Sequence, residues 1–255
     1  MDVVASGIAI SAYDRGVTAN ASIYLVDLRR LSVPDSLLES VLIPEERERA
    51  NRFRRAEDRR RYLVGRSLIR GQLGEALGTH PETVELRFGD QGKPFVSEGP
   101  AFNLSHSGDY VLAGFTDQGR IGVDVEQHST RPDIDALMRR CFSDWEIERV
   151  APLDAAERRA AFFRIWARKE ALLKALGGGL SIELKSASFD PASMNENTLR
   201  ALDLPAEDMH EWSVLPLEIS AQAAGAVALD RAAFDFELHR ICDADLKNVI
   251  RALAT

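Results

Sequence analysis

The order of apolar and polar residues predicts one long helix in each half of the chain. Between Asp58 and Leu77, apolar residues recur at helical spacing, and Gly78 is placed to end the helix. The positions expected to face the core are Tyr62, Ile69, Leu73 and Leu77. A second long helix is expected to begin after Asp154 and to end at a run of glycines that starts with Gly177.

Short strands and shorter helices account for most of the remaining chain. Strands are expected over residues 21–28, 84–88, 102–106, 110–116, 120–126, 186–189, 212–218, 223–229 and 234–238. Shorter helices are expected to begin at Pro44 and Ile134, at Ser143, where Glu146 completes the spacing of a capping box, and at Asp243.

This pattern predicts an α+β fold of two similar α/β subdomains related by a pseudo-twofold axis. Each subdomain is expected to pack a long helix on an antiparallel sheet, with a cleft between the two. We expect the first subdomain to cover residues 1–126 and the second 127–255, joined by the polar segment 129–133.

The formal net charge of −8 opposes a general affinity for nucleic acid or for membrane surfaces. Residues 45–70 differ from the rest, because they hold ten arginines and only five acids. Either a local anion site or a solvated helix laced with Glu–Arg pairs accounts for this run. No signal peptide or membrane span is evident, and Cys141 and Cys242 lack metal-type spacing. We therefore expect a cytoplasmic protein with buried, reduced thiols.

The expected strand ending at Glu126 carries the first candidate for chemistry. Alternate residues of a strand share a face, so Gly122, Asp124 and Glu126 are expected on the side opposite the core. Gly122 would leave room there for a ligand. Two such close carboxylates repel each other unless a cation lies between them, and oxygen ligands favour Mg²⁺. An exposed strand with solvated acids is the simpler interpretation of this motif alone.

Two further segments carry candidate residues. Trp166, Glu170 and Lys174 are four residues apart on the second long helix and so line one face, as a cleft wall or as a plain Glu–Lys pair. The segments 92–94 and 103–108 offer a lysine, serines and a histidine at turns, where such groups often meet phosphate. Ordinary turns are the alternative for both.

In this order along the chain, the segments resemble the surfactin-type (Sfp-like) 4′-phosphopantetheinyl transferases. The family pattern Gly-x-Asp-x-Glu stands at 122–126, and Trp-x-x-Lys-Glu-x-x-x-Lys stands at 166–174. Gly-Lys-Pro at 92–94, Asn-x-Ser-His-Ser-Gly at 103–108 and the basic runs at 44–49 and 57–61 also match, so the resemblance spans residues 44–180. One departure is Glu46, where some members of the family carry a lysine.

The resemblance implies transfer of the 4′-phosphopantetheine group of coenzyme A to a serine of an apo acyl or peptidyl carrier protein, with release of 3′,5′-ADP. Asp124, Glu126 and Glu170 are implied to hold Mg²⁺, with Mn²⁺ as the alternative. Catalytic roles fall to Asp124, to Lys174 beside the pyrophosphate and to Glu170 as the base that deprotonates the serine, directly or through water, with Glu146 as its rival. The implied ligands of the coenzyme A phosphates are Arg49, Arg61, Lys93, Ser105, His106 and Lys174.

Segment 177–180 and the arginine-rich helices are the implied docking surface for the acidic carrier, and the internal similarity favours a monomer. Three other functions remain open. They are a coenzyme A-binding protein without transfer activity, a nucleic-acid-binding module built on residues 45–70, and another Mg²⁺-dependent enzyme of phosphoryl chemistry.

Overall fold

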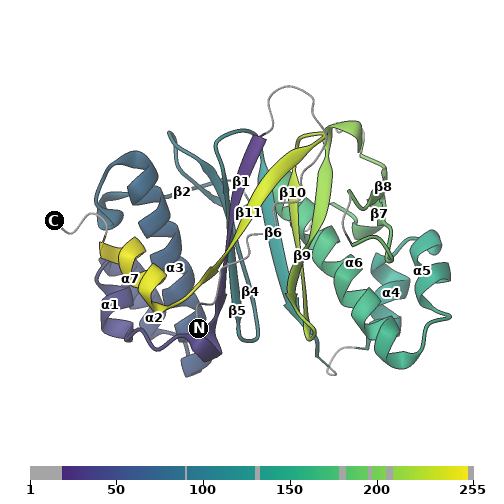
Figure 1. The fold of residues 1–255 in the computed structure, drawn as a ribbon, viewed down its shortest axis with the longest axis horizontal. Helices are drawn as coiled ribbons and strands as arrows, with labels where there is room; N and C mark the ends of the chain where they lie inside the picture. Colours follow the sequence, from purple (N-terminus) through teal and green to yellow (C-terminus); the bar gives the residue numbers. More distant parts are fainter. Residues whose placement is uncertain are drawn as a thin grey trace, which may run out of the picture.

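The computed structural model describes residues 19–89, 91–129, 133–177, 182–194, 197–204 and 209–251. Two sheets pack face to face in the middle of the molecule, and helices cover both outer faces (Figure 1). The predicted α+β class is therefore confirmed. No helix among the described residues is long and apolar enough to cross a bilayer.

The first sheet contains β1 (Ala19–Asp27), β4 (Ala101–Ser107), β5 (Tyr110–Thr116) and β11 (Phe234–Ile241). Its strand order is β11-β1-β5-β4, and every pair is antiparallel except β1 with β11, which is parallel. Its outer face is covered by α1 (Asp35–Glu39), α2 (Pro44–Asn51), α3 (Ala56–Leu77) and α7 (Asp243–Arg251), seen at the left of Figure 1.

The second sheet contains β6 (Ile121–Gln127), β9 (Ser213–Ser220) and β10 (Ala223–Leu229) in the antiparallel order β6-β10-β9. The long helix α6 (Ala155–Leu176) covers its outer face. Around α6 lie α4 (Ile134–Cys141), α5 (Asp144–Val150) and the small sheet of β7 (Ala187–Phe189) with β8 (Leu199–Leu202). Two short strands, β2 (Arg87–Phe88) and β3 (Pro94–Phe95), pair with each other in antiparallel fashion.

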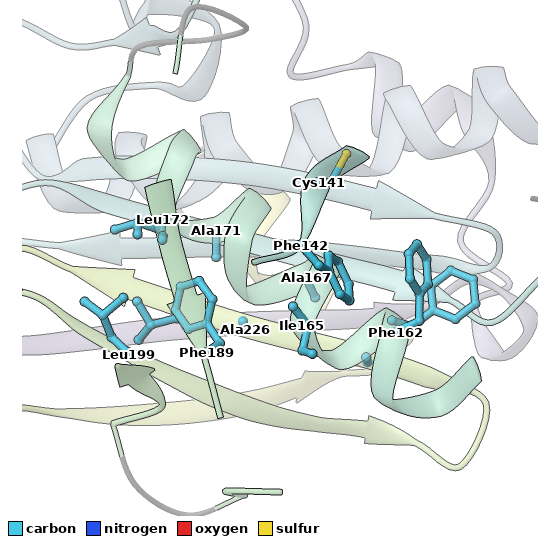
Figure 2. Close-up of a cluster of buried hydrophobic side chains, with 14 of the residues drawn as sticks. Cys141, Phe142, Phe162, Ile165, Ala167, Ala171, Leu172, Phe189, Leu199 and Ala226 are labelled. Atoms are coloured by element: carbon cyan, nitrogen blue, oxygen red, sulfur yellow. The ribbon is translucent and has the colours of Figure 1, made fainter. Parts of the chain in front are cut away.

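Three apolar clusters stabilise this arrangement. One lies between the two sheets, one lies beneath α3, and one lies beneath α6. Figure 2 shows the third, in which Phe162, Ile165 and Leu172 of α6 share a cluster with Phe142 and Phe189. Because each sheet is covered on both faces, every residue of β5 and of β10 is buried, which explains why these strands are apolar almost throughout.

The predicted helix ends are confirmed. Gly78 and Gly177 both follow a long helix in the left-handed conformation, with φ of 62° and 73°. The Asp154 side chain accepts hydrogen bonds from the first-turn amides of α6, and Ser143 with Glu146 forms a complete capping box. These ends are set by side chains within a few residues, which is why the sequence alone locates them.

The C-terminal segment lies with the first half of the molecule, unlike the predicted grouping of residues 127–255. Strand β11 pairs with β1, and Leu246 and Ile250 of α7 are buried in the cluster beneath α3. The Ser32 amide donates to Asp243 at the start of α7 (2.8 Å), which ties this helix to the first half. Strand β6, which we had grouped with the first half, pairs with β10 instead. Strand β1 pairs with β5 on one side, and its other edge pairs with β11, which is distant in the sequence.

Smaller expectations also need correction. The strand expected over 84–88 is reduced to Arg87–Phe88, because Pro81–Thr83 forms a short 3₁₀ helix just before it. Strand β8 was not predicted. Cys141 is buried as expected, but Cys242 is exposed.

Candidate active site

The two sheets meet where β4 lies beside β6, and polar side chains of β4 bridge them. The side-chain oxygens of Asn103, Ser105 and Ser107 accept hydrogen bonds from the backbone amides of Val123 (2.9 Å), Val125 (3.4 Å) and Gln127 (3.2 Å). These alternate side chains replace a backbone ladder and hold the two edges in register. Sequence reasoning did not assign a site role to Asn103 or Ser107. Each lies two residues from Ser105, but the expected strand, 102–106, included only Asn103 and left Ser107 in the following turn.

Asp124 lies at the centre of this seam and is only 3% exposed. Its Oδ1 accepts hydrogen bonds from Ser105 Oγ (2.8 Å) and from Lys174 Nζ (2.6 Å), and Lys174 Nζ also donates to Ser105 Oγ (2.9 Å). Its Oδ2 is buried and has no hydrogen-bond partner in the described part of the chain. Asp124 of β6 and Lys174 of α6 are therefore brought together, and the aspartate keeps an unsatisfied oxygen.

Gly122 explains how closely α6 approaches β6. A Cβ atom at this position would lie 2.0 Å from the carbonyl oxygen of Ala171 and 2.4 Å from the amide nitrogen of Ala175. The expectation that Gly122 leaves room for a ligand is wrong, because the backbone of α6 fills this space. The predicted alternation of β6 is confirmed, since Ile121, Val123 and Val125 all face the cluster between the sheets.

The three acids of the predicted metal site share one electrostatic environment. Burial and the neighbouring Asp124 raise the pKa of Glu126 to about 7, and Glu170 adds to this effect. Burial and Asp124 also raise the pKa of Glu170. For Asp124 itself, burial raises the pKa more than Lys174 and Ser105 lower it. Burial thus makes each carboxylate harder to ionise. For Glu126 and Glu170, the negative charge of neighbouring acids adds to this effect.

This donor set has the chemistry that a hard divalent cation prefers. All three side chains offer carboxylate oxygens, and one buried oxygen of Asp124 lacks a partner. Among the described residues, however, no group of three or more His, Cys, Asp or Glu side chains is arranged to hold a metal ion. Instead, the Lys174 ammonium is the cation paired with Asp124.

Three of the residues predicted to bind phosphate lie on the first half of the molecule. Arg61 donates to the Gly108 carbonyl (2.5 Å) and pairs with Asp58. His106 reaches solvent, but the protein atoms around its ring partly desolvate it. This desolvation and the nearby Arg61 guanidinium lower the pKa of His106. Arg49 is exposed, lies 5.5 Å from the ring centroid of Tyr62, and forms no ion pair within the described segments.

Lys93 is instead committed to backbone groups. Its Nζ donates to the carbonyl oxygens of Ile121 (3.0 Å), Lys174 (2.6 Å) and Ala175 (3.5 Å). Burial, assisted by Arg120, lowers the pKa of Lys93 to about 8. The lysine therefore joins the C-terminal end of α6 to the start of β6, where a cation meets the negative end of the helix dipole.

Glu46, at the position where some family members carry lysine, is buried. Its carboxylate pairs with Arg70 (2.5 Å) and lies 3.7 Å from Arg66, so it joins α2 to α3. Two arginines of the basic run thus share one carboxylate inside the protein, and position 46 supplies no cation.

Glu146, the alternative base, is fully buried away from solvent. It accepts hydrogen bonds from the amides of Ser143 (2.8 Å) and Phe189 (2.9 Å), and pairs with Lys169 (2.9 Å). The capping-box interpretation is confirmed, and this carboxylate has no route to a substrate. Of the expected docking segment 177–180, only Gly177 belongs to the described residues.

Comparisons with known proteins agree on one family. Residues 120–228 match the sequence model of the 4′-phosphopantetheinyl transferase superfamily, and residues 35–116 match that of the 4′-phosphopantetheinyl transferase N-terminal region. The chain is 34% identical over 211 residues to the 4′-phosphopantetheinyl transferase HetI of Nostoc sp., covering 78% of this chain and 84% of that protein. It is 33% identical over 179 residues to the putative 4′-phosphopantetheinyl transferase slr0495 of Synechocystis sp., covering 68% of this chain and 71% of that one.

Proposed function

Because the chain belongs to the 4′-phosphopantetheinyl transferase superfamily, we propose that it transfers the 4′-phosphopantetheine group of coenzyme A to a serine hydroxyl of an apo carrier protein. The observation that supports this most directly is the meeting of Asp124 and Lys174 at 2.6 Å, although they lie 50 residues apart on different elements. Both belong to the two motifs on which the resemblance rests, and Glu126 and Glu170 share their electrostatic environment.

Asp124, Glu126 and Glu170 would hold the divalent cation, Mg²⁺ or Mn²⁺. Such an ion, when bound, neutralises charge on the pyrophosphate of coenzyme A and polarises its oxygens. The unsatisfied Oδ2 of Asp124 and the mutual repulsion of the acids support this assignment. Lys174, which lies beside Asp124, would contact the phosphates of coenzyme A.

The remaining steps concern the side chains of this protein. The serine Oγ attacks the β-phosphorus while the bond from that phosphorus to the bridging oxygen breaks, so 3′,5′-ADP carries away the bonding electrons. Glu170 accepts the serine proton directly or through water, since it is partly accessible and its pKa is raised towards the working range of a base. Lys174 stabilises the charge that develops on the leaving phosphate.

Arg49, Arg61 and His106 would bind the nucleotide phosphates of coenzyme A, because they lie exposed or half-buried on the first half of the molecule. Ser105 and Lys93 contribute by positioning Asp124 and α6, according to their contacts. The arginine-rich segment between α2 and α3 would attract the acidic carrier, together with segment 177–180.

We retain three broader proposals. The two halves are related by a pseudo-twofold axis, since α3 and α6 are both 22 residues long and each covers one sheet. The functional division lies near residue 126, at the seam, with the C-terminal segment returning to the first half. The protein acts as a cytoplasmic monomer, which size-exclusion chromatography with light scattering would test.

Incubation of the purified protein with coenzyme A, Mg²⁺ and a panel of apo carriers tests the proposal. We expect one carrier to gain the mass of a single phosphopantetheine group, with equimolar 3′,5′-ADP released, and a chelator to stop both. Coenzyme A binding without any mass gain across the panel would instead identify a non-catalytic binding protein. Release of 3′,5′-ADP without a carrier would indicate another phosphoryl enzyme, and tight salt-sensitive binding in a gel shift would favour the nucleic-acid module.

A further inference from the structure

A pocket lies on the opposite side of α6 from the seam. Its volume is about 500 Å³, within the usual range for small-molecule pockets, and it lies between α6, β9 and the loop that follows β7. Arg168, which lines it, is two residues before Glu170, so the two side chains project about 200° apart around the helix. The pocket is therefore separate from the group of acids at the seam.

The wall formed by α6 is cationic. Arg164 and Arg168 lie one helical turn apart and line the pocket, and neither forms an ion pair in the described part of the chain. Arg164 Nε donates to the Pro191 carbonyl (3.3 Å), whereas Arg168 donates to the carbonyls of Asp190 (2.5 Å) and Ser193 (2.6 Å). Both guanidinium groups are thus held in place by neutral carbonyl oxygens, and not by a carboxylate in direct contact within the described segments.

Two polar atoms of the lining lack partners. Arg168 has no solvent exposure, yet its Nε has no hydrogen-bond partner among the described residues, and neither does the buried Nε2 of His128. Buried groups without partners are rare in folded proteins, and each calls for an explanation. His128 stacks on Phe163, with ring centroids 5.0 Å apart, and burial together with Arg164 and Arg159 lowers its pKa.

The opposite wall is apolar and made of small residues. Pro216 of β9 and Ala224 of β10 belong to this wall, and Ala160 lines the pocket from the α6 side. The lining also contains Glu218, whose side chain is exposed, and Arg240, which donates to the carbonyls of Glu218 (2.6 Å) and Ile219 (3.2 Å). An inorganic anion alone would leave much of this volume and all of this apolar wall without contacts.

We propose that this pocket binds a small organic anion, with a carboxylate or phosphate group against Arg164 and His128, near the buried charge of Arg168, and an apolar body against Ala160, Pro216 and Ala224. Guanidinium groups suit either anion, because their planar donors match two oxygens at once.

The test uses phenyl phosphate and benzoate as probes, with phenol as the uncharged control, on the full chain saturated with coenzyme A. We expect saturable binding in calorimetry, with a dissociation constant of about 1 mM or tighter, and a shift of the His128 ring resonances in NMR spectra. The tighter of the two anions identifies the preferred acidic group. Phenol is expected not to bind measurably.

Two variants locate the site, and one serves as control. Arg164→Gln removes a charge that is only half-buried, and Ala160→Phe fills the pocket from a partly exposed position. Each should weaken binding about tenfold or more. Arg158→Gln removes an equal charge from α6, where Arg158 faces Asp135 outside the pocket, and should not change binding. Absence of saturable binding, or binding that survives both pocket variants, would overturn the proposal.

Discussion

Adjacent residues of α6 serve two ionic clusters of opposite character. Lys169 pairs with Glu146 inside the second half. Glu146 accepts hydrogen bonds from the amides of Ser143 and Phe189, and Lys169 donates one to the Leu184 carbonyl, so this cluster is satisfied and closed to solvent. Glu170 faces the seam, where three acids meet one lysine and Asp124 Oδ2 has no partner among the described residues. The satisfied cluster joins secondary-structure elements, whereas the unsatisfied one has capacity to bind a cation.

This contrast separates two residues that the family motif places side by side. A buried pair with complete hydrogen bonding stabilises one arrangement and leaves nothing for a ligand. An excess of buried carboxylate raises the free energy of the unliganded state, so a cation that relieves the repulsion binds more strongly.

The largest effect is expected from Asp124→Asn. The amide can keep a contact with Ser105 but removes the charge that faces Lys174, so kcat/KM for carrier modification should fall at least about 10³-fold while the protein stays folded. Mass spectrometry of the carrier measures the rate, and a thermal melt measures folding. Asp117→Asn, in the exposed turn between β5 and β6, should leave the rate unchanged. Comparable rates for Asp124→Asn and the native protein would remove the seam from the mechanism.

Glu146→Ala should mainly lower stability, whereas Asp124→Asn should mainly lower activity. It leaves the Lys169 ammonium buried without its counter-ion, and the free energy of unfolding should fall by about 3–5 kcal/mol. Urea denaturation measures this. Glu148→Ala, exposed on the same helix, should change stability by less than about 0.5 kcal/mol. An unchanged denaturation midpoint for Glu146→Ala would contradict the structural role of this pair.

The metal-free protein should lose stability as the pH rises from about 4.5 to about 7. The folded-state pKa of Glu126, about 7, exceeds its usual 4.5, so in this range the folded chain binds the proton more strongly than the unfolded chain does. Denaturation with a chelator present, repeated across this pH range, measures the slope. Glu126→Gln should flatten it, and Mg²⁺ should restore stability mainly at the upper end. A free energy of unfolding that rises with pH over this range would show that ionised Glu126 does not destabilise the folded protein.

A smaller effect is expected at the exposed Arg49 of α2. Arg49→Gln removes a guanidinium without an ion pair in the described chain and should raise the KM for coenzyme A about tenfold, with little change in kcat. Initial rates at varied coenzyme A measure it, and Arg139→Gln, exposed on α4, provides the control. Equal KM values for both variants would assign the phosphates to other residues.

Local features of this protein were predictable because their causes lie within a few residues. The glycine ends at Gly78 and Gly177, the capping box at Ser143 and the alternation of β6 all depend on neighbours along the chain. The alternating pattern also indicated that Asp124 and Glu126 share a face.

Contacts between distant residues were decided by packing. No local signal states that β11 pairs with β1 across the molecule, or that Gly122 admits the backbone of α6 rather than a ligand. The same holds for Lys93, whose cation was expected at phosphate and instead lies among carbonyls at the end of α6.

The sequence by itself determined the two long helices and their ends, most of the strands, and the identity of the groups that carry charge, because these depend on short-range sterics and hydrogen bonding. Only the tertiary structure decided which charges are neutralised. Glu46 and Glu146 find buried partners and become structural, while Asp124 keeps a free oxygen beside Lys174. Pairing depends on which elements pack together and how closely, and that is fixed only when the whole chain folds.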